Sequence, residues 1–212
     1  QAHALDYRIP LKWRHFLQFN ALLSRARPTF NYGLFAQDAR NIAGSVRYTV
    51  PVKGGNNPIE VYGLLDFKQS NNNLEYGGFQ VLSAQTDVYH VGTGLSIVRR
   101  KDGGAWMLGV NLMVSPGNVN SRNTTEALAT GRLGAKARYA YGNLSVQRLV
   151  NLGPGLDWVL KGVGQLSTCN LPSSEQFSIG GSSTVRGYGE RIFSGEQGFA
   201  LTNELVLPPT AI

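Results

Sequence analysis

The sequence predicts an all-β fold, a portion of an antiparallel transmembrane β-barrel. Charged residues are scarce and glycine is abundant. Apolar and polar residues alternate along successive segments. The connections between these segments are short and long by turns. Outer-membrane-type barrels combine these features, because every strand turns one face to lipid and the other to the interior.

The composition fits strands that are only half apolar. Charged residues make up 16% of the 212 residues, against about 25% in ordinary soluble domains. The chain has 26 glycines and 10% aromatic residues, with a mean hydropathy of -0.16. No run approaches the roughly 18 apolar residues that a membrane helix needs. A soluble β-sandwich shares this composition and is the alternative fold at this point.

A period of two in the hydrophobic pattern locates the strands. In residues 59–67, for example, Ile59, Val61 and Leu65 alternate with Glu60 and Asp66. The eight predicted strands cover about residues 11–23, 42–50, 59–67, 87–98, 105–114, 132–148, 156–169 and 198–207. All of them belong to one barrel domain over 1–212.

The strand predicted at 132–148 assigns faces to its side chains by the same alternation. Its apolar face would carry Leu133, Ala135, Ala137, Tyr139 and Tyr141. Arg132, Lys136 and Arg138 would lie on the opposite face. We therefore expect the two tyrosines to face lipid and the basic side chains to face the interior.

The predicted connections alternate in length. Those at 51–58, 99–104 and 151–155 are short, and those at 24–41, 68–85, 115–131 and 170–197 are long and polar. Bacterial outer-membrane barrels have short periplasmic turns and longer outer loops in this alternation. Structureless loops of this length are uncommon in compact soluble domains. The alternation of short and long connections therefore favours the membrane barrel over the soluble β-sandwich.

Charge and cysteine content exclude several classes of function. The net charge is +7, but the basic residues are spread along the strands, so we expect no nucleic-acid partner. Cys169 is alone, and the three histidines lie in separate segments without metal-ligand spacing, so neither a metal nor a cofactor is expected. Nucleophile-elbow and phosphate-loop motifs are missing, so the sequence does not predict an enzyme. The first residues do not read as a signal peptide, and we expect the chain to begin within a longer protein.

The longest connection carries the most distinctive motif of the chain. Gly180-Gly181 is followed by Val185-Arg186-Gly187-Tyr188, then by Ser194-Gly195-Glu196-Gln197-Gly198 and by Asn203-Glu204-Leu205. This series resembles the inward-folded loop of the Omp85 superfamily. It is most similar to the outer-membrane transporters of two-partner secretion, of the haemolysin-activator and adhesin-exporter type. The resemblance is close over residues 133–208, and the earlier strands match in pattern only.

The resemblance implies a fold and a function for the whole protein. Members carry two POTRA domains before a sixteen-stranded barrel, of which this chain would supply the fifth to twelfth strands, without the POTRA domains or the closing strands. The implied protein is an outer-membrane pore of a Gram-negative bacterium. It is monomeric, surrounded by outer-membrane lipid, and secretes a partner exoprotein, such as an adhesin or haemolysin, without ATP. An Omp85-type insertase, a passive porin and a soluble β-structured enzyme or lectin are the alternatives.

The chemistry of the loop motif supports the inward fold that the resemblance implies. Gly180, Gly181 and Gly187 allow positive φ and a close backbone approach. Arg186 can hold a carboxylate, and alternation places Glu204 on the interior face of the last strand, so the pair Arg186–Glu204 is predicted. The remaining motif residues are Val185 and Tyr188, the latter expected to pack the loop tip against the wall. Further side chains expected to line the interior are Arg47, Lys136, Arg138 and Lys161.

Overall fold

The computed structural model describes the chain except for residues 28, 31–34, 77–78, 102, 182–183 and 208–212. The strands of its large sheet are β1 (Ala2–Pro10), β2 (Phe16–Ala26), β3 (Thr29–Phe30), β4 (Phe35–Lys53), β5 (Ile59–Tyr76), β6 (Phe79–Lys101), β7 (Gly104–Ser115), β8 (Tyr139–Gly153), β9 (Leu156–Ser167) and β12 (Gly198–Val206). The other elements are β10 (Phe177–Ile179), β11 (Phe193–Gly195), the helix α1 (Thr125–Gly131) and the 3-10 turns η1 (Lys12–Arg14) and η2 (Ser173–Glu175).

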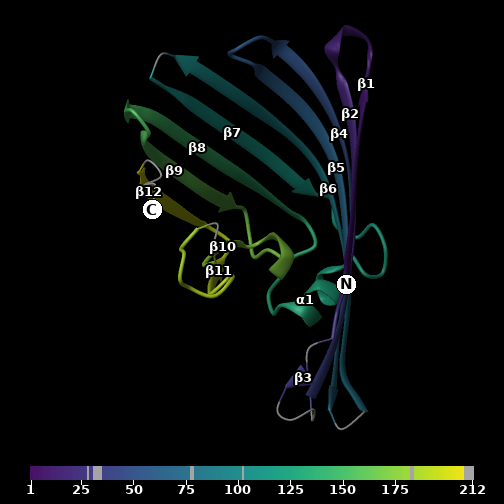
Figure 1. Cartoon of the computed structure of the whole chain (residues 1–212). Helices are drawn as coiled ribbons and strands as arrows, with labels where there is room; N and C mark the ends of the chain where they lie inside the picture. The colour runs from purple at the N-terminus through teal and green to yellow at the C-terminus, as the bar shows by residue number, and fades with distance from the viewer. Residues whose placement is uncertain (28, 31–34, 77–78, 102, 182–183, 208–212) are drawn as a thin grey trace.

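The large sheet is a strongly curved antiparallel meander (Figure 1). Its order is β1-β2-β4-β5-β6-β7-β8-β9-β12, and β3 pairs with β4. Within the described residues β1 and β12 remain the two edges, so the sheet is open. Figure 1 shows α1 and the small β10–β11 sheet inside the curve, near one end of the strands. The all-β antiparallel fold class predicted from the sequence is confirmed.

The strand register gathers the apolar side chains on the convex face. Val46 of β4 is paired with Leu65 of β5, Leu65 with Val91 of β6, and Val91 with Val114 of β7. Because paired residues point to the same side of a sheet, this row continues across the strands. Large apolar side chains on this face remain exposed, among them Leu65, Val91, Leu112, Val114, Leu166, Phe199 and Leu201. A contiguous apolar face of this kind is suited to contact with lipid.

The concave face carries the polar half of each strand. Neighbouring positions in the register place Asn20, Ser45 and Asp66 in one row. A polar hollow of about 380 Å³ lies on this face, lined by Gln18, Asn20, Ser45, Arg47, Tyr62, Leu64, Asp66, Lys68, Asn111, Met113, Tyr141 and Asn143. The faces therefore have the polarity that alternation predicts.

Two of the predicted long loops are largely strand. Residues 24–41 and 68–85 were expected to be loops, but β2 continues to Ala26, β4 starts at Phe35, and β5 and β6 pair from Ile59 to Tyr76. Polar residues occupy both faces of these extensions, including the adjacent Ser70 and Asn71. The hydrophobic period therefore disappears while the backbone ladder continues, and periodicity alone misses the strands. In Figure 1 these hairpins project beyond the rest of the sheet, at the end that holds β3.

The N-terminal region also differs from the prediction. The segment 11–23 was expected to be one strand, whereas β1 and β2 are separate strands joined by the turn η1. Trp13 and Arg14 adopt φ of 60° and 65° in this turn, which breaks the extended backbone. With β1 included, the main path has nine strands in the described residues, where about eight were expected.

The segment before β8 requires a correction. The predicted strand 132–148 begins only at Tyr139, because residues 125–131 form α1 and 132–138 are irregular. Tyr139 and Tyr141 are buried on the concave side, with exposed fractions of 3% and 9%, rather than facing lipid. The tyrosines do share one face of the strand, as the alternation predicts, but this face is the concave one and not the lipid-facing one. The sequence pattern is the same for tyrosines that are buried inside a barrel and for tyrosines that face lipid. Among the described residues, no helix is long and apolar enough to cross a membrane.

Candidate functional site

Two long segments of the chain fold onto the concave face. They are residues 116–138, which contain α1, and residues 168–197, which contain η2, β10 and β11. Together with the wall they enclose a small apolar core of Val88, Met113, Leu128, Ala135, Ala137, Tyr139, Tyr141 and Leu171. Leu128 and Leu171, one from each segment, are among its most deeply buried residues. A packed core at this position fixes both segments inside the curve.

The first segment, 116–138, covers an exposed strand edge. β6 pairs with β7 only from Val91 onward, so its preceding residues have no strand partner on that side in the described chain. The backbone N–H of Asp87 donates to the carbonyl of Arg122 at 3.1 Å, and the Asn123 amide donates to the carbonyl of Asp87 at 2.8 Å. Asn120 donates to the Asp87 carboxylate at 2.8 Å. The segment thus satisfies backbone groups that a sheet edge would otherwise leave open.

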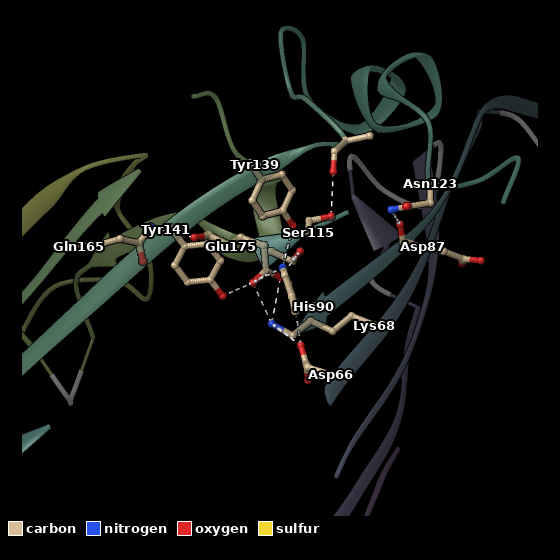
Figure 2. Close-up of polar contacts among 12 residues, drawn as sticks. Asp66, Lys68, Asp87, His90, Ser115, Asn123, Tyr139, Tyr141, Gln165 and Glu175 are labelled. Atoms are coloured by element: carbon tan, nitrogen blue, oxygen red, sulfur yellow. Dashed lines mark hydrogen bonds and ion pairs between the residues drawn. The ribbon is translucent and has the colours of Figure 1, made fainter. Parts of the chain in front are cut away.

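The second segment, 168–197, is attached to the wall through Glu175 (Figure 2). The Lys68 ammonium on β5 donates to both carboxylate oxygens of Glu175, at 2.9 and 3.1 Å. The Tyr141 hydroxyl on β8 donates to the same carboxylate at 2.8 Å. The Glu175 side chain is only 1% exposed. A buried carboxylate with a cation and a hydroxyl as donors is a strong attachment point between a loop and a wall.

His90 and Asp66 extend this polar cluster along the wall. One ring nitrogen of His90, Nδ1, lies 3.1 Å from the Asp66 carboxylate, and the other, Nε2, lies 2.8 Å from the Tyr139 hydroxyl. His90 Nε2 is also 3.8 Å from Glu175. Lys68 lies 3.6 Å from Asp66. The cluster of Asp66, Lys68, His90, Tyr139, Tyr141 and Glu175 is called the lumen cluster below.

The electrostatic environment keeps Glu175 ionised. Burial alone would raise the pKa of its carboxyl, since it disfavours the charged form. The charges of Lys68 and His90 act in the opposite direction, together with hydrogen bonds from Lys68 and Ser174. The net result is a pKa of Glu175 below its ordinary value. The Glu175 attachment is therefore an ion pair at neutral pH.

A second group of contacts joins the two inward segments to each other and joins the 168–197 segment to strand β9 of the wall. Arg132, just after α1, donates to the carbonyl of Leu171 at 2.7 Å and forms an ion pair with Glu196. Gln165 on β9 donates to the backbone carbonyls of Glu175, at 2.9 Å, and of Glu196, at 3.2 Å. Both ends of the 168–197 segment are thereby fixed near the wall.

The glycine-arginine motif forms the tip of the 168–197 segment, beyond the β10–β11 ladder. Gly180, Gly181 and Gly187 have φ of 117°, 82° and 88°, which a side chain would strain. A Cβ on Gly181 would collide with the carboxylate of Glu190. Ser182 and Ser183, within the motif, lie outside the described residues. Tyr188 is 60% exposed, so the predicted packing of its ring against the wall is not seen.

The predicted contact between Arg186 and Glu204 is present. Arg186 Nη2 donates to Glu204 Oε1 at 2.7 Å. Their side chains are 71% and 33% exposed. An ion pair this open to solvent contributes about 0–1 kcal/mol, far less than a buried attachment.

The other residues predicted to line the interior divide into two groups. Arg47 lies on the concave face with its guanidinium 3.5 Å from the centre of the Tyr62 ring. Lys161 is on the same face of β9 as the buried Gln165, by alternation. Lys136 and Arg138 are both exposed, and the alternating Ala135 and Ala137 are buried, so a role for the two basic side chains in lining the interior stays a prediction. Their segment is irregular rather than strand, and the apolar residues face inward.

The lumen cluster does not follow from the sequence. Glu175 stands in a polar connection with no motif around it, and nothing in its local sequence distinguishes it from a solvated glutamate. A weak signal existed on the wall, since Asp66, Lys68 and His90 are ionisable residues inside strands with an apolar opposite face. Ionisable residues at such positions mark functional sites in membrane proteins.

The fold and the site together define a class of protein. A curved antiparallel sheet with an apolar convex face, a polar concave face and an inward-folded loop is the wall of a membrane β-barrel. Over residues 1–212 the chain matches the family described as haemolysin secretion/activation protein ShlB/FhaC/HecB. The chain belongs to this family, whose members are two-partner secretion transporters of the outer membrane.

A solved structure supports the same fold. CdiB from Escherichia coli matches with a TM-score of 0.79 and 19% sequence identity, over 96% of this chain and 38% of that chain. The chain therefore spans about two fifths of the length of this relative. At this identity the similarity establishes the fold. No curated protein matches the chain.

Proposed function

We propose that the chain forms wall strands and the inward loop of an outer-membrane pore that secretes a partner exoprotein, such as an adhesin or haemolysin. The observation that carries this proposal is the 168–197 segment, which bears the glycine-arginine motif and lies on the concave face of a barrel wall of this family. Secretion requires no bond chemistry from the chain. The energy would come from binding on the periplasmic side and folding outside, since the outer membrane has no ATP.

The two faces of the sheet have separate roles in this proposal. The convex apolar face contacts outer-membrane lipid, and the full-length protein acts as a monomer. The concave face, which becomes the lumen on closure, contacts the extended exoprotein. Arg47 and Lys161 are placed to do so, because both lie on this face. Arg186 holds the loop tip to Glu204 inside the lumen.

The experiment that tests this function uses cells lacking the gene for the full-length protein. The proposal expects one exoprotein to accumulate in the periplasm while other outer-membrane proteins keep their normal levels. A general loss of outer-membrane proteins would instead indicate an assembly factor. Complementation with Arg186→Ala should restore the barrel to the membrane but leave secretion poor, and normal secretion would refute the role given to Arg186. Arg138→Ala, an exposed arginine outside the loop, is the matched control.

A further inference from the structure

We propose that Glu175, through its ion pair with Lys68, is the latch that fixes the inward loop against the barrel wall and keeps the pore closed at rest. The inference rests on the proposed function and assigns its regulation to a residue outside the glycine-arginine motif. Glu175 acts here as a positioning residue, since it holds the loop in place and contacts no substrate.

The contacts of Glu175 join one loop position to several strands. Lys68 comes from β5 and Tyr141 from β8, and both donate to the Glu175 carboxylate. Gln165 on β9 holds the Glu175 backbone carbonyl. Withdrawal of the loop must break all of these contacts at once. Among the described residues, the ion pair of Arg186 joins the loop to one strand, β12, through Glu204.

The two attachments of the loop, through Glu175 and through Arg186, differ in how deeply they are buried. The Glu175 side chain is 1% exposed, whereas Arg186 is 71% exposed. Water weakens the attraction between exposed charges and compensates each partner on separation. With exposed fractions of 34% for Lys68 and 1% for Glu175, this pair is screened less by water than the pair of Arg186. Its separation also breaks the hydrogen bonds from Tyr141 and Gln165, so Glu175 provides the stronger attachment.

The wall is built to let this latch open and close. When Glu175 leaves, Lys68 keeps Asp66 as a partner at 3.6 Å, and Asp66 also keeps His90 at 3.1 Å. The wall cation is therefore not left unpaired in the open state. A cation with an alternative carboxylate on its own strand lowers the free-energy cost of release, and this distinguishes a latch from a permanent anchor.

Single-channel recording of the full-length protein in planar lipid bilayers tests the latch. Glu175→Lys places two cations together, and the fraction of time spent conducting should rise about tenfold or more, since a loss of about 1.4 kcal/mol already shifts an equilibrium tenfold. The charge swap Glu175→Lys with Lys68→Glu is made together with Asp66→Asn, because a carboxylate at position 68 would otherwise lie beside Asp66. This swap should return the channel to within about twofold of the Asp66→Asn protein. Glu126→Gln on α1, which removes an exposed carboxylate, should have no effect.

Two results would overturn the latch. One is Glu175→Lys behaving like the unchanged channel, and the other is a charge swap that conducts as much as the single variant. Restoration by the swap is the decisive readout, because a variant that merely damages packing is not rescued by a second change of charge. If Glu175→Lys does not assemble, Glu175→Gln decides, since it keeps the shape and loses the charge: increased conduction supports the latch, and unchanged conduction refutes it.

The same recordings separate this inference from the proposed function. If the channel conducts more in Glu175→Lys and conducts less again in the swap, the latch is supported. This holds even if the secretion assay finds no exoprotein that depends on the protein, a result that would refute only the proposed function. If secretion of the exoprotein depends on the protein but conduction does not change in the Glu175 variants, the secretion function stands and the latch is refuted.

Discussion

Lys68 on β5 and Glu175 in η2, which are 107 positions apart in sequence, form a hydrogen-bonded ion pair at 2.9 Å on the concave face of the sheet. This contact joins a strand of the wall to the root of the inward loop. It lies among side chains from β5, β6 and β8, which contribute Asp66, His90, Tyr139 and Tyr141. The loop therefore has a buried attachment to the wall in addition to the exposed contact of its arginine.

Removing the cation of this pair should destabilise the barrel more than removing both partners. Lys68→Met leaves the Glu175 carboxylate buried without its cation, which costs roughly 3–5 kcal/mol in comparable cases. The double variant Lys68→Met with Glu175→Gln removes both charges of this pair and should recover most of that loss. Urea unfolding of the full-length protein in lipid vesicles measures the difference. Equal destabilisation by the single and the double variant would contradict the pairing.

Acidification should release the loop. The pKa of Glu175 lies below its ordinary value, because the charges of Lys68 and His90 outweigh the effect of burial. A carboxyl with a lowered pKa stabilises the folded state fully above about pH 4.3, the ordinary value, and loses this contribution as the pH falls through the folded-state pKa below that. Lys68, His90 and Tyr141 lie next to this carboxyl, Asp66 contacts Lys68 and His90, and Tyr139 contacts His90. All five residues are unchanged in the variant Glu175→Gln, which is the control for this prediction.

The measurement for this prediction is channel conduction from pH 7 to about pH 3. Conduction of the unchanged protein should rise below about pH 4.3, whereas Glu175→Gln should start high and show no rise from this group. A transition of the same size and position in Glu175→Gln would assign the effect to another group, such as Asp66.

Loss of Arg186 should leave the stability of the barrel nearly unchanged. Its pair with Glu204 is largely exposed, so Arg186→Ala should cost about 0–1 kcal/mol. Urea unfolding compares it with Glu175→Gln, which should be the more destabilising of the two. A larger loss for Arg186→Ala would show that the exposed contact, and not the buried one, holds the loop.

The edge of β6 provides a prediction independent of the loop. Asn123 donates its amide to the backbone carbonyl of Asp87 in a buried contact. Asn123→Ala leaves this carbonyl without its donor, which costs about 1–3 kcal/mol for a buried group. Hydrogen exchange of the backbone amide of Asp87, which donates to Arg122, should then accelerate, while exchange in the β8–β9 ladder stays as before. Unchanged exchange at Asp87 would refute the role of this segment in covering the edge.

How far the sequence predicts this molecule depends on which physical signal each part carries. Strand positions such as Ile59 and Leu156 follow from alternation, because the two environments of a barrel strand differ in polarity. The extensions around Asn71 carry no such signal, since both of their faces are polar. The orientation of Tyr139 depends on which side the inward segments fold, and that is decided by tertiary packing.

In the candidate site, too, one contact can be predicted from the sequence and another cannot. The contact of Arg186 with Glu204 could be predicted from the motif and from strand parity, since both residues lie in or next to one connection. The Glu175–Lys68 pair joins segments 107 positions apart, and no local pattern fixes a contact at that separation. A buried ion pair of this kind becomes visible only when the fold is known.

The most direct test of the buried attachment is a distance between the loop and the wall. Spin labels are attached to cysteines introduced at Ile192 in the loop and at Leu152 near the β8–β9 turn, which are both exposed positions. Cys169→Ser removes the thiol that residues 1–212 contain. Pulsed electron resonance of the full-length protein should give one narrow distance distribution. The distribution should broaden in Glu175→Lys and become narrow again in the swap with Lys68→Glu and Asp66→Asn. The same distribution in all three proteins would contradict the attachment of the loop through Glu175.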